Sequence, residues 1–191
     1  MQLLCERIKR DGRVLPGDIL KVDSFLNQQI DAVLITACAH ELHRLFVGEN
    51  VTKILTVEAS GIALAFAAAQ VFGVPMVFAK KSRSANRSPE VYSAEVASYT
   101  HGSVNRISVS KQYLSACDRV LIVDDFLALG NAMNGLISLC EQAGAHICGA
   151  GVAIEKKYQG GGDFLRGRGF RVEALASVLS MTDDALVLAE D

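Results

Sequence analysis

The sequence predicts an α/β fold with a mostly parallel central sheet flanked by helices. Short aliphatic runs alternate along the chain with helix-forming stretches, and this is the pattern of the β-α units that build such sheets. The chain has 191 residues, of which 50% are hydrophobic and 21% are charged, as is typical of a globular domain. Tryptophan is absent and aromatic residues contribute only 6%. We therefore expect a single domain over residues 1–191 with an aliphatic core.

The helices and strands can be placed in order along this chain. Residues 1–12 read as an amphipathic helix that stops at Gly12, and residues 13–28 indicate an irregular arm or an edge hairpin. Residues 29–46 have the apolar spacing of a helix. Further along, the pattern predicts buried strands at 54–57, 74–79, 119–125, 147–155 and 171–179, an antiparallel pair within 91–110, and helices at 62–72 and 131–144. The three glycines at 160–162 are expected to form a flexible loop.

Charge and cysteine content exclude several classes of protein. The 19 lysines and arginines are balanced by 21 acidic residues, for a net charge of -2, which argues against a protein that coats nucleic acid. Five cysteines are scattered without a C-x-x-C pair, which disfavours a disulfide framework and fits a reducing compartment. His40 and His43 have no third ligand in a metal-binding pattern, so we expect no metal site built from protein ligands alone. With no signal peptide and no long apolar span, the chain is expected to be cytoplasmic, without a membrane or nucleic-acid partner.

The most informative stretch is VLIVDDFLALGNAMNGL at residues 120–136. An aliphatic strand ends on Asp124 and Asp125, Gly130 permits a tight turn, and a helix begins near Asn131. The first N–H groups of a helix bind anions, and the helix dipole adds to this attraction. Two acids beside such a loop suit a phosphorylated sugar, because carboxylates accept hydrogen bonds from the hydroxyls while the loop holds the phosphate. The alternatives are a helix cap or a magnesium site of another α/β protein; the glycine patterns of P-loop and dinucleotide-binding proteins are absent.

This stretch resembles the phosphoribosyl-pyrophosphate signature of the type I phosphoribosyltransferases. Over almost its whole length the chain is similar to the purine branch of that family, and within it to the xanthine-specific group of Gram-positive bacteria. The similarity lies in LKVDSFLNQQID at 20–31, TVEASGIA at 56–63, VPMVFAKK at 74–81, VDDFLALGNA at 123–132 and GVAIEKKYQ at 151–159. The resemblance implies the type I phosphoribosyltransferase fold, with a small hood over the active site built from residues 1–36 and about 156–191. It also implies transfer of a phosphoribosyl group from phosphoribosyl pyrophosphate to xanthine in purine salvage, Mg²⁺ bound mainly through the substrate's pyrophosphate, and a homodimer.

The resemblance assigns the phosphoribosyl site to three segments. Asp124 and Asp125 would hold the ribose hydroxyls as catalytic residues. Lys81, also catalytic, would bring positive charge to the pyrophosphate, in its own site or in the neighbouring subunit's site of a dimer. The residues that would bind phosphoribosyl pyrophosphate are Ala128, Leu129, Gly130, Asn131 and Ala132 around the 5-phosphate, and Glu58, Ala59, Ser60 and Gly61 around the pyrophosphate. In this family the second of these loops often contains a non-proline cis peptide. Taken without the family, it reads as a helix start with Ser60 as N-cap.

The same resemblance assigns the purine to Leu20, Asn27, Lys156 and Phe126. Lys156 would donate to an exocyclic oxygen, Asn27 would contact the 2-oxo edge, and Phe126 would stack on the ring. Taken alone, Asn27 reads as a turn or cap residue and Lys156 as a surface lysine. The polar segment after Lys81, which includes Arg83 and Arg87, is expected to form a lid, although a solvated basic loop is the simpler interpretation of the two arginines.

The loop departs from the family pattern at two positions. Leu129 stands where a polar residue is usual, and Ala132 offers no hydroxyl to the phosphate. Phosphate binding is therefore expected to depend on backbone N–H groups.

Two other functions remain open at this point. One is transfer to hypoxanthine or guanine, and the other is a non-catalytic regulator that senses phosphoribosyl pyrophosphate. The regulator is disfavoured because residues 1–28 are too short and too weakly basic to form a nucleic-acid-binding domain.

Overall fold

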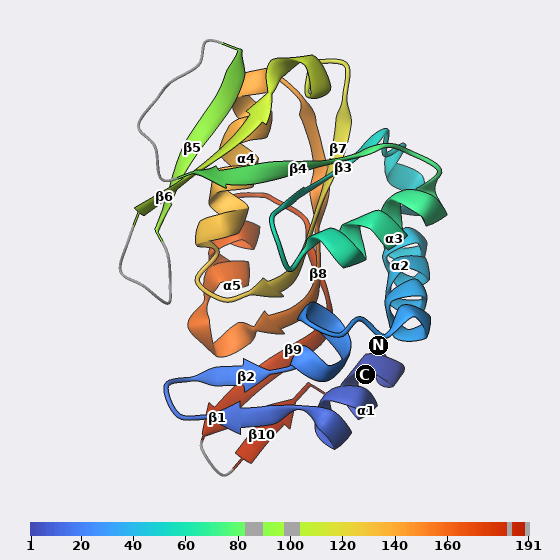
Figure 1. Ribbon diagram of the computed structural model, residues 1–191, viewed down its shortest axis with the longest axis vertical. Coiled ribbons are helices and arrows are strands. Elements are labelled where there is room, and N and C mark those ends of the chain that lie inside the picture. The colour runs from blue at the N-terminus through green and yellow to red at the C-terminus, as the bar shows by residue number, and fades with distance from the viewer. Residues whose placement is uncertain (83–89, 98–103, 183–184, 190–191) are drawn as a thin grey trace.

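The computed structural model describes residues 1–82, 90–97, 104–182 and 185–189. Its main feature is an eight-stranded sheet in the order β10-β9-β8-β7-β3-β4-β6-β5, formed by the described strands. The five central neighbours β9, β8, β7, β3 and β4 are parallel, while β6, β5 and β10 pair antiparallel at the two sides. The prediction of a mostly parallel sheet is therefore confirmed (Figure 1).

The strands fall where aliphatic runs predict them. Their bounds are β3 Lys53–Val57, β4 Met76–Ser82, β5 Val91–Ala97, β6 Val104–Ser110, β7 Arg119–Leu127, β8 His146–Lys156, β9 Val172–Thr182 and β10 Ala185–Leu188. β7 and β8 are buried along nearly their whole length, as expected of strands covered on both faces. The sequence pattern missed only β10 among these strands.

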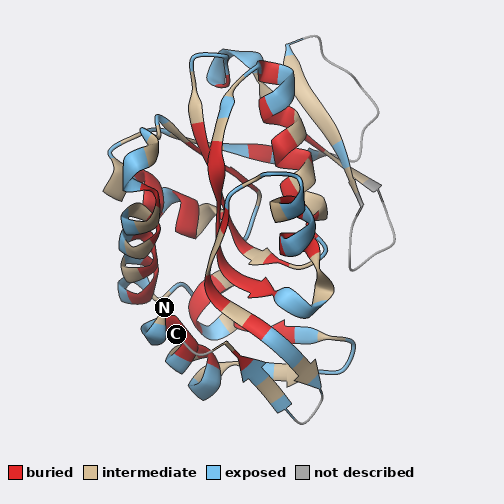
Figure 2. Ribbon diagram, turned by 180° about the vertical axis from the view of Figure 1, so that it is seen from behind, coloured by how far each residue is buried: buried red, intermediate tan, exposed pale blue. Residues whose placement is uncertain are grey.

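Helices cover both faces of the sheet and bury two core clusters. α2 (Ala32–Phe46) and α3 (Ile62–Phe72) pack on one face, and α4 (Asn131–Ala143) and α5 (Gly161–Gly167) pack on the other. The local signals are those of ordinary helices: Asp31 caps α2 through its carboxylate, and Gly73 ends α3 in a left-handed conformation. Figure 2 shows the buried residues concentrated in the central strands and on the inner sides of the helices.

The N-terminal arm forms a separate small layer beside the C-terminal strands β9 and β10. It consists of α1 (Gln2–Asp11), the antiparallel hairpin β1 (Arg13–Leu15) and β2 (Ile19–Lys21), and the short π-helix η1 (Asp23–Asn27). Buried side chains of this arm share a core cluster with residues of β9 and β10, and Figure 1 shows these elements side by side. We call residues 1–28 the hood arm. Of the alternatives predicted for residues 13–28, a hairpin is present at 13–21, but it forms a two-stranded sheet of its own and is not an edge of the main sheet.

Three single-turn helices complete the description: η2 (Val47–Glu49), η3 (Lys111–Tyr113) and η4 (Lys157–Gln159). In the part of the chain that the structure describes, no helix is long and apolar enough to cross a membrane.

Candidate active site

The acidic pair lies at the carboxyl end of β7 and is buried. Asp124 and Asp125 are 5% and 6% exposed. Ser60 donates its hydroxyl to Asp125 Oδ1 at 3.0 Å, and Asn27 donates its amide Nδ2 to Asp125 Oδ2 at 3.2 Å. The carboxylate of Asp125 therefore joins three segments that are far apart in the sequence: the strand end, the loop after β3 and the hood arm.

Asp124 is held in an environment that disfavours its charge. Burial raises its pKa well above the ordinary carboxyl value, and the negative charge of Asp125 raises it further, while the positive charge of Lys81 opposes both effects. Its Oδ1 accepts the backbone N–H of Asp125 at 3.0 Å. Hydroxyl donors or a cation that approach a carboxylate in this environment stabilise its charged form.

The loop after β3 is anchored to β4 through Glu58. Its backbone N–H donates to the carbonyl of Ala79 at 3.0 Å, and its carboxylate Oε1 accepts the backbone N–H of Lys81 at 2.5 Å. The peptide bond between Glu58 and Ala59 is cis, as the family resemblance predicts.

Gly61 allows this loop to lie directly against the acidic pair. A Cβ at this position would be 2.3 Å from Thr56 Oγ1 and 2.4 Å from Asp124 Oδ1, far inside van der Waals contact. The N-cap of α3 is Gly61 and not Ser60, whose hydroxyl instead bonds Asp125. The interpretation of Ser60 as an N-cap is therefore wrong, and its side chain belongs to the site.

The second loop connects β7 to α4. Ala128 and Leu129 follow the strand, Gly130 turns the chain with a φ of 83°, and Asn131 and Ala132 form the first turn of α4. Helix α4 therefore begins shortly after the acidic pair in the chain, and the amino end of a helix is a position at which main-chain N–H groups can bind an anion.

The side chains of Asn134 and Arg168 hold the turn of this loop at Gly130. Asn134 donates its backbone N–H and its Nδ2 to the carbonyl of Gly130 at 2.8 and 3.0 Å. Arg168 in turn donates to Asn134 Oδ1 at 2.7 Å. The turn is therefore fixed before any ligand binds.

Helix α5 supports the loop from below. The backbone N–H of Gly161 donates to the carbonyl of Ala128 at 3.1 Å, and a Cβ at Gly161 would lie 2.2 Å from that same oxygen and 2.7 Å from the nitrogen of Gly130. The prediction of a flexible loop at 160–162 is thus wrong for Gly161 and its neighbour Gly162. These glycines start a helix, and the lack of a side chain at Gly161 permits its backbone to touch that of the loop.

An ion pair fixes α5 to the sheet. Glu155 on β8 is buried and accepts two hydrogen bonds from Arg166, both at 2.8 Å. Gly162 lies against this pair, because a Cβ there would be 1.9 Å from Glu155 Oε1.

Two of the candidate purine residues, Leu20 and Asn27, belong to the hood arm, and the other two, Phe126 and Lys156, lie on the strands β7 and β8. Leu20 is buried, and Phe126 is half-buried against the core cluster that includes the arm. Asn27 contacts the acidic pair as described, and Lys156 is only 7% exposed and donates its ammonium group to the main-chain carbonyl of Asp18. The interpretations of Asn27 as a turn or cap residue and of Lys156 as a surface lysine are therefore not what the structure shows.

Comparison with known proteins agrees with this geometry. The family model described as phosphoribosyl transferase domain matches residues 21–162. The chain belongs to the phosphoribosyltransferase family.

Curated relatives named xanthine phosphoribosyltransferase match this phosphoribosyltransferase over its full length. The protein from Lactobacillus delbrueckii subsp. bulgaricus is 53% identical over 187 residues, which cover 98% of this chain and 99% of that protein. The one from Ruminiclostridium cellulolyticum is 50% identical over 190 residues and covers 100% of both. The one from Bacillus cereus is 48% identical over 190 residues, 100% of this chain and 96% of its own.

Solved structures of adenine phosphoribosyltransferases share the fold. The enzyme from Giardia lamblia superposes with a TM-score of 0.75 at 22% identity, over 91% of this chain and 97% of its own. The enzyme from Trypanosoma brucei gives a TM-score of 0.77 at 15% identity, over 95% and 82%. The expected type I phosphoribosyltransferase fold is confirmed.

Several residues around the candidate site carry no signal in the sequence. Tyr158 and Gln159 both donate to Asp18 beside Lys156, and Asn134 and Gly161 contact the loop at 128–130. Tyr158 and Gln159 end the segment GVAIEKKYQ at 151–159, which carries part of the family resemblance. This is the only local indication of their importance. The predicted lid, with Arg83 and Arg87, lies outside the described residues.

Proposed function

We propose that this phosphoribosyltransferase moves the phosphoribosyl group of phosphoribosyl pyrophosphate onto xanthine, giving xanthosine 5'-monophosphate and pyrophosphate, in cytoplasmic purine salvage. The observation that carries the reaction is the buried acidic pair, which links the loop after β3, the end of β7 and the hood arm at Asp125. The choice of xanthine rests on the relatives at about 50% identity that carry that name.

Each segment has one task in the transfer. Asp124 and Asp125 accept hydrogen bonds from the ribose hydroxyls, and the N–H groups of 128–132 together with the helix dipole hold the 5-phosphate. The loop 58–61 and the charge of Lys81 hold the pyrophosphate. The bond from ribose C1 to pyrophosphate breaks as a purine ring nitrogen bonds to C1, and the positive charge that develops on the sugar is stabilised by the nearby carboxylates.

Asn27 and Ser60 would share Asp125 with the bound ribose. Both side chains hydrogen-bond its carboxylate oxygens, which are the oxygens that the ribose hydroxyls need. Each carboxylate oxygen has two lone pairs, so it can accept a ribose hydroxyl and keep its hydrogen bond to the protein.

The acidic pair also suits the cofactor Mg²⁺, which we propose binds mainly through the substrate. Mg²⁺ prefers oxygen ligands and is usually held by one or two carboxylates plus substrate phosphates. Asp124 fits this role because burial disfavours its unpaired negative charge. Among the described residues no group of three His, Cys, Asp or Glu side chains could hold a metal alone. When bound, the ion neutralises charge on the departing pyrophosphate.

The purine would lie between the acidic pair and the hood, which we assign to residues 1–36 and about 156–191. The ammonium group of Lys156 donates to an oxo group, whereas adenine presents an amino group that is itself a donor. Asn27 Oδ1 is buried without a hydrogen-bond partner in the described structure, so it is an acceptor for a ring N–H of xanthine. Leu20 and Phe126 supply the apolar walls.

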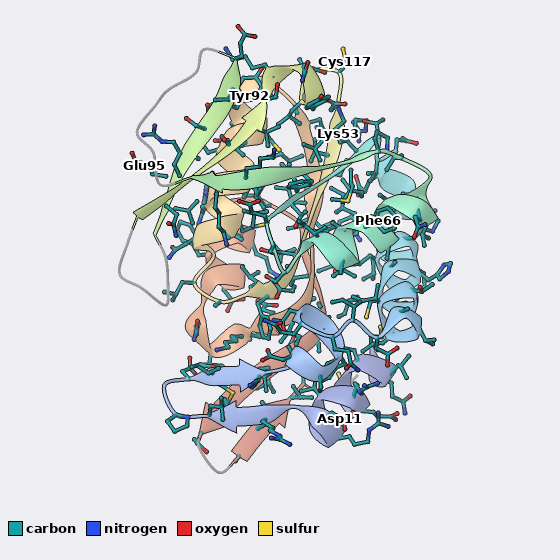
Figure 3. All side chains as sticks on the ribbon, in the orientation of Figure 1. Asp11, Lys53, Phe66, Tyr92, Glu95 and Cys117 are labelled. Carbon is teal, nitrogen blue, oxygen red and sulfur yellow. The ribbon has the colours of Figure 1, made fainter. Side chains whose placement is uncertain are left out.

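An apolar face supports a homodimer. Phe66 on α3 is 55% exposed (Figure 3), and Phe78 on the adjacent strand β4 is 38% exposed. A second copy that covers these large aromatic side chains removes their apolar surface from water, and this stabilises the dimer. Sedimentation of the wild-type protein and of Phe66→Asp tests this: a dimer that dissociates in the variant is expected, and a monomeric wild type would refute it.

An assay of the purified protein with phosphoribosyl pyrophosphate, Mg²⁺ and each purine in turn tests the proposed function. We expect the highest kcat/KM for xanthine and loss of turnover when Mg²⁺ is chelated. Equal kcat/KM for guanine or hypoxanthine would refute the choice of substrate. Binding of phosphoribosyl pyrophosphate without turnover of any purine would instead indicate a regulator.

A further inference from the structure

The turn between β1 and β2 carries an unusual residue at its tip. Leu15 pairs with Ile19, so the turn consists of three residues that end on Asp18. Gly17 and Asp18 have φ values of 85° and 63°, in the left-handed region that favours glycine and that aspartate tolerates better than most residues. This conformation directs the carbonyl and the carboxylate of Asp18 to the same neighbouring segment.

All three oxygens of Asp18 accept hydrogen bonds from residues 156–159. Its main-chain carbonyl accepts from Lys156 Nζ, its Oδ1 accepts from the hydroxyl of Tyr158, and its Oδ2 accepts from Nε2 of Gln159. The Nζ of Lys156 is also 3.8 Å from Asp18 Oδ2. A single turn residue thus fastens the hood hairpin to the end of β8 and to η4.

The charges around Lys156 make Asp18 its counterion. Burial lowers the pKa of Lys156, and the charge and hydrogen bond of Asp18 raise it. The adjacent Glu155 bonds Arg166 at α5 on the other face of the sheet, and the following Lys157 is exposed. On β9, the strand that pairs here, the partner of Lys156 is the uncharged Val178.

We propose that Asp18 is a positioning residue that directs the ammonium group of Lys156 toward the purine. A lysine has a long flexible side chain with three N–H donors. One donor is fixed on the carbonyl of Asp18, and the turn that carries this carbonyl is itself fixed by Tyr158 and Gln159. The remaining donors then have a defined direction. This inference rests on the proposed function, in which Lys156 binds the base.

A double-mutant cycle separates this role from general loosening of the hood. Asp18→Ala keeps the main-chain carbonyl but removes the carboxylate, which bonds Tyr158 and Gln159 and lies beside the ammonium group of Lys156. It should therefore lower kcat/KM for xanthine about 10-fold, because the turn that carries the carbonyl loosens, and should leave the KM for phosphoribosyl pyrophosphate unchanged. In a Lys156→Ala background the same change should have almost no further effect, because its route of action is gone. Equal losses in both backgrounds, or an equal rise in the KM for phosphoribosyl pyrophosphate, would overturn the proposal.

Two matched variants sharpen the cycle. Tyr158→Phe removes one of the donors to Asp18 and should lower kcat/KM for xanthine in the same direction but less. Leu15→Ala alters an exposed residue of the same hairpin and should leave it unchanged. A loss with Leu15→Ala as large as that with Asp18→Ala would count against the role of Asp18.

A measurement without turnover distinguishes failure of this inference from failure of the proposed function. In protein carrying ¹³Cε-labelled lysine, with the Lys156 signal assigned from Lys156→Arg, the pKa of Lys156 should fall in Asp18→Asn relative to wild type. The sign follows because the substitution removes the negative charge that favours the ammonium form. An unchanged pKa would refute the coupling, whereas a wild-type protein that does not turn over xanthine would refute only the proposed function.

Discussion

The two halves of the proposed site, one for the phosphoribosyl group and one for the purine, are built in different ways. In the phosphoribosyl half, glycines allow main-chain segments to approach their neighbours closely. Gly61 lies against Asp124, and Gly161 lies against the loop at 128–130. The purine half is made of side chains from distant segments, with Asn27 and Asp125 98 residues apart and Asp18 and Lys156 138 residues apart. The first half therefore has little freedom to change without damage to the fold, and the second half can change one side chain at a time.

The largest expected effect tests the residue that belongs to both halves. Asp125→Asn should lower kcat/KM about 1,000-fold, because it removes a preorganised charge next to the reacting sugar. Steady-state kinetics with xanthine and phosphoribosyl pyrophosphate measure it, and an unchanged melting temperature would show that the fold is intact. A loss of less than 10-fold would mean that Asp125 only connects the segments.

The next effect tests the tolerance of the backbone half. Gly161→Ala forces the loop at 128–130 to move, because the added Cβ would meet the carbonyl of Ala128 at 2.2 Å. We expect a loss of about 100-fold in kcat/KM for phosphoribosyl pyrophosphate, as for a displacement of about 1 Å in a positioned site. Gly167→Ala in the same helix meets no atom within 4 Å and serves as the control. Similar kinetics for both variants would show that the contact under the loop is unimportant.

A smaller effect is expected in the side-chain half. Lys156→Ala should lower kcat/KM for xanthine about 10-fold, since one hydrogen bond from a charged donor is lost, and should change the ranking of purines. The KM for phosphoribosyl pyrophosphate should stay the same. The same ranking in the variant as in wild type would contradict a role in base selection.

The smallest effect concerns stability. Because the folded-state pKa of Asp124 lies above the ordinary value of 3.8, its contribution to stability is present below pH 3.8 and is lost as the pH rises through the folded-state pKa. Asp124→Asn should therefore raise the free energy of unfolding of the ligand-free protein by about 1 kcal/mol at pH 7, with the gain vanishing near pH 3.8. Urea unfolding at both values of pH measures it, and a variant that is less stable at pH 7 would contradict the sign.

The sequence predicts the sheet well, and it also brings the acidic pair and the following turn into view, because both are encoded locally. Aliphatic runs give the central strands, and Asp124, Asp125 and Gly130 fall within seven neighbouring residues. Helix α5 could not be predicted, because its two leading glycines are typical of loops and their role appears only where the backbone of residues 128–130 touches them. The bond from Asn27 to Asp125 and the contacts of Asp18 likewise have no local pattern, since they depend on how the hood arm folds back onto the sheet.

Two neighbouring residues at the end of β8 contact different parts of the molecule. Glu155 bonds Arg166 of α5, the helix that contacts the loop at 128–130, and Lys156 bonds the hairpin of the hood. Successive residues of a strand face opposite sides, so an insertion or deletion of one residue before this point would exchange an acid for a base on each side. A chimaera of related chains joined between Glu155 and Lys156 would take Lys156 and Arg166 from one parent and their partners Asp18 and Glu155 from the other, so it should fold well only when both pairs match.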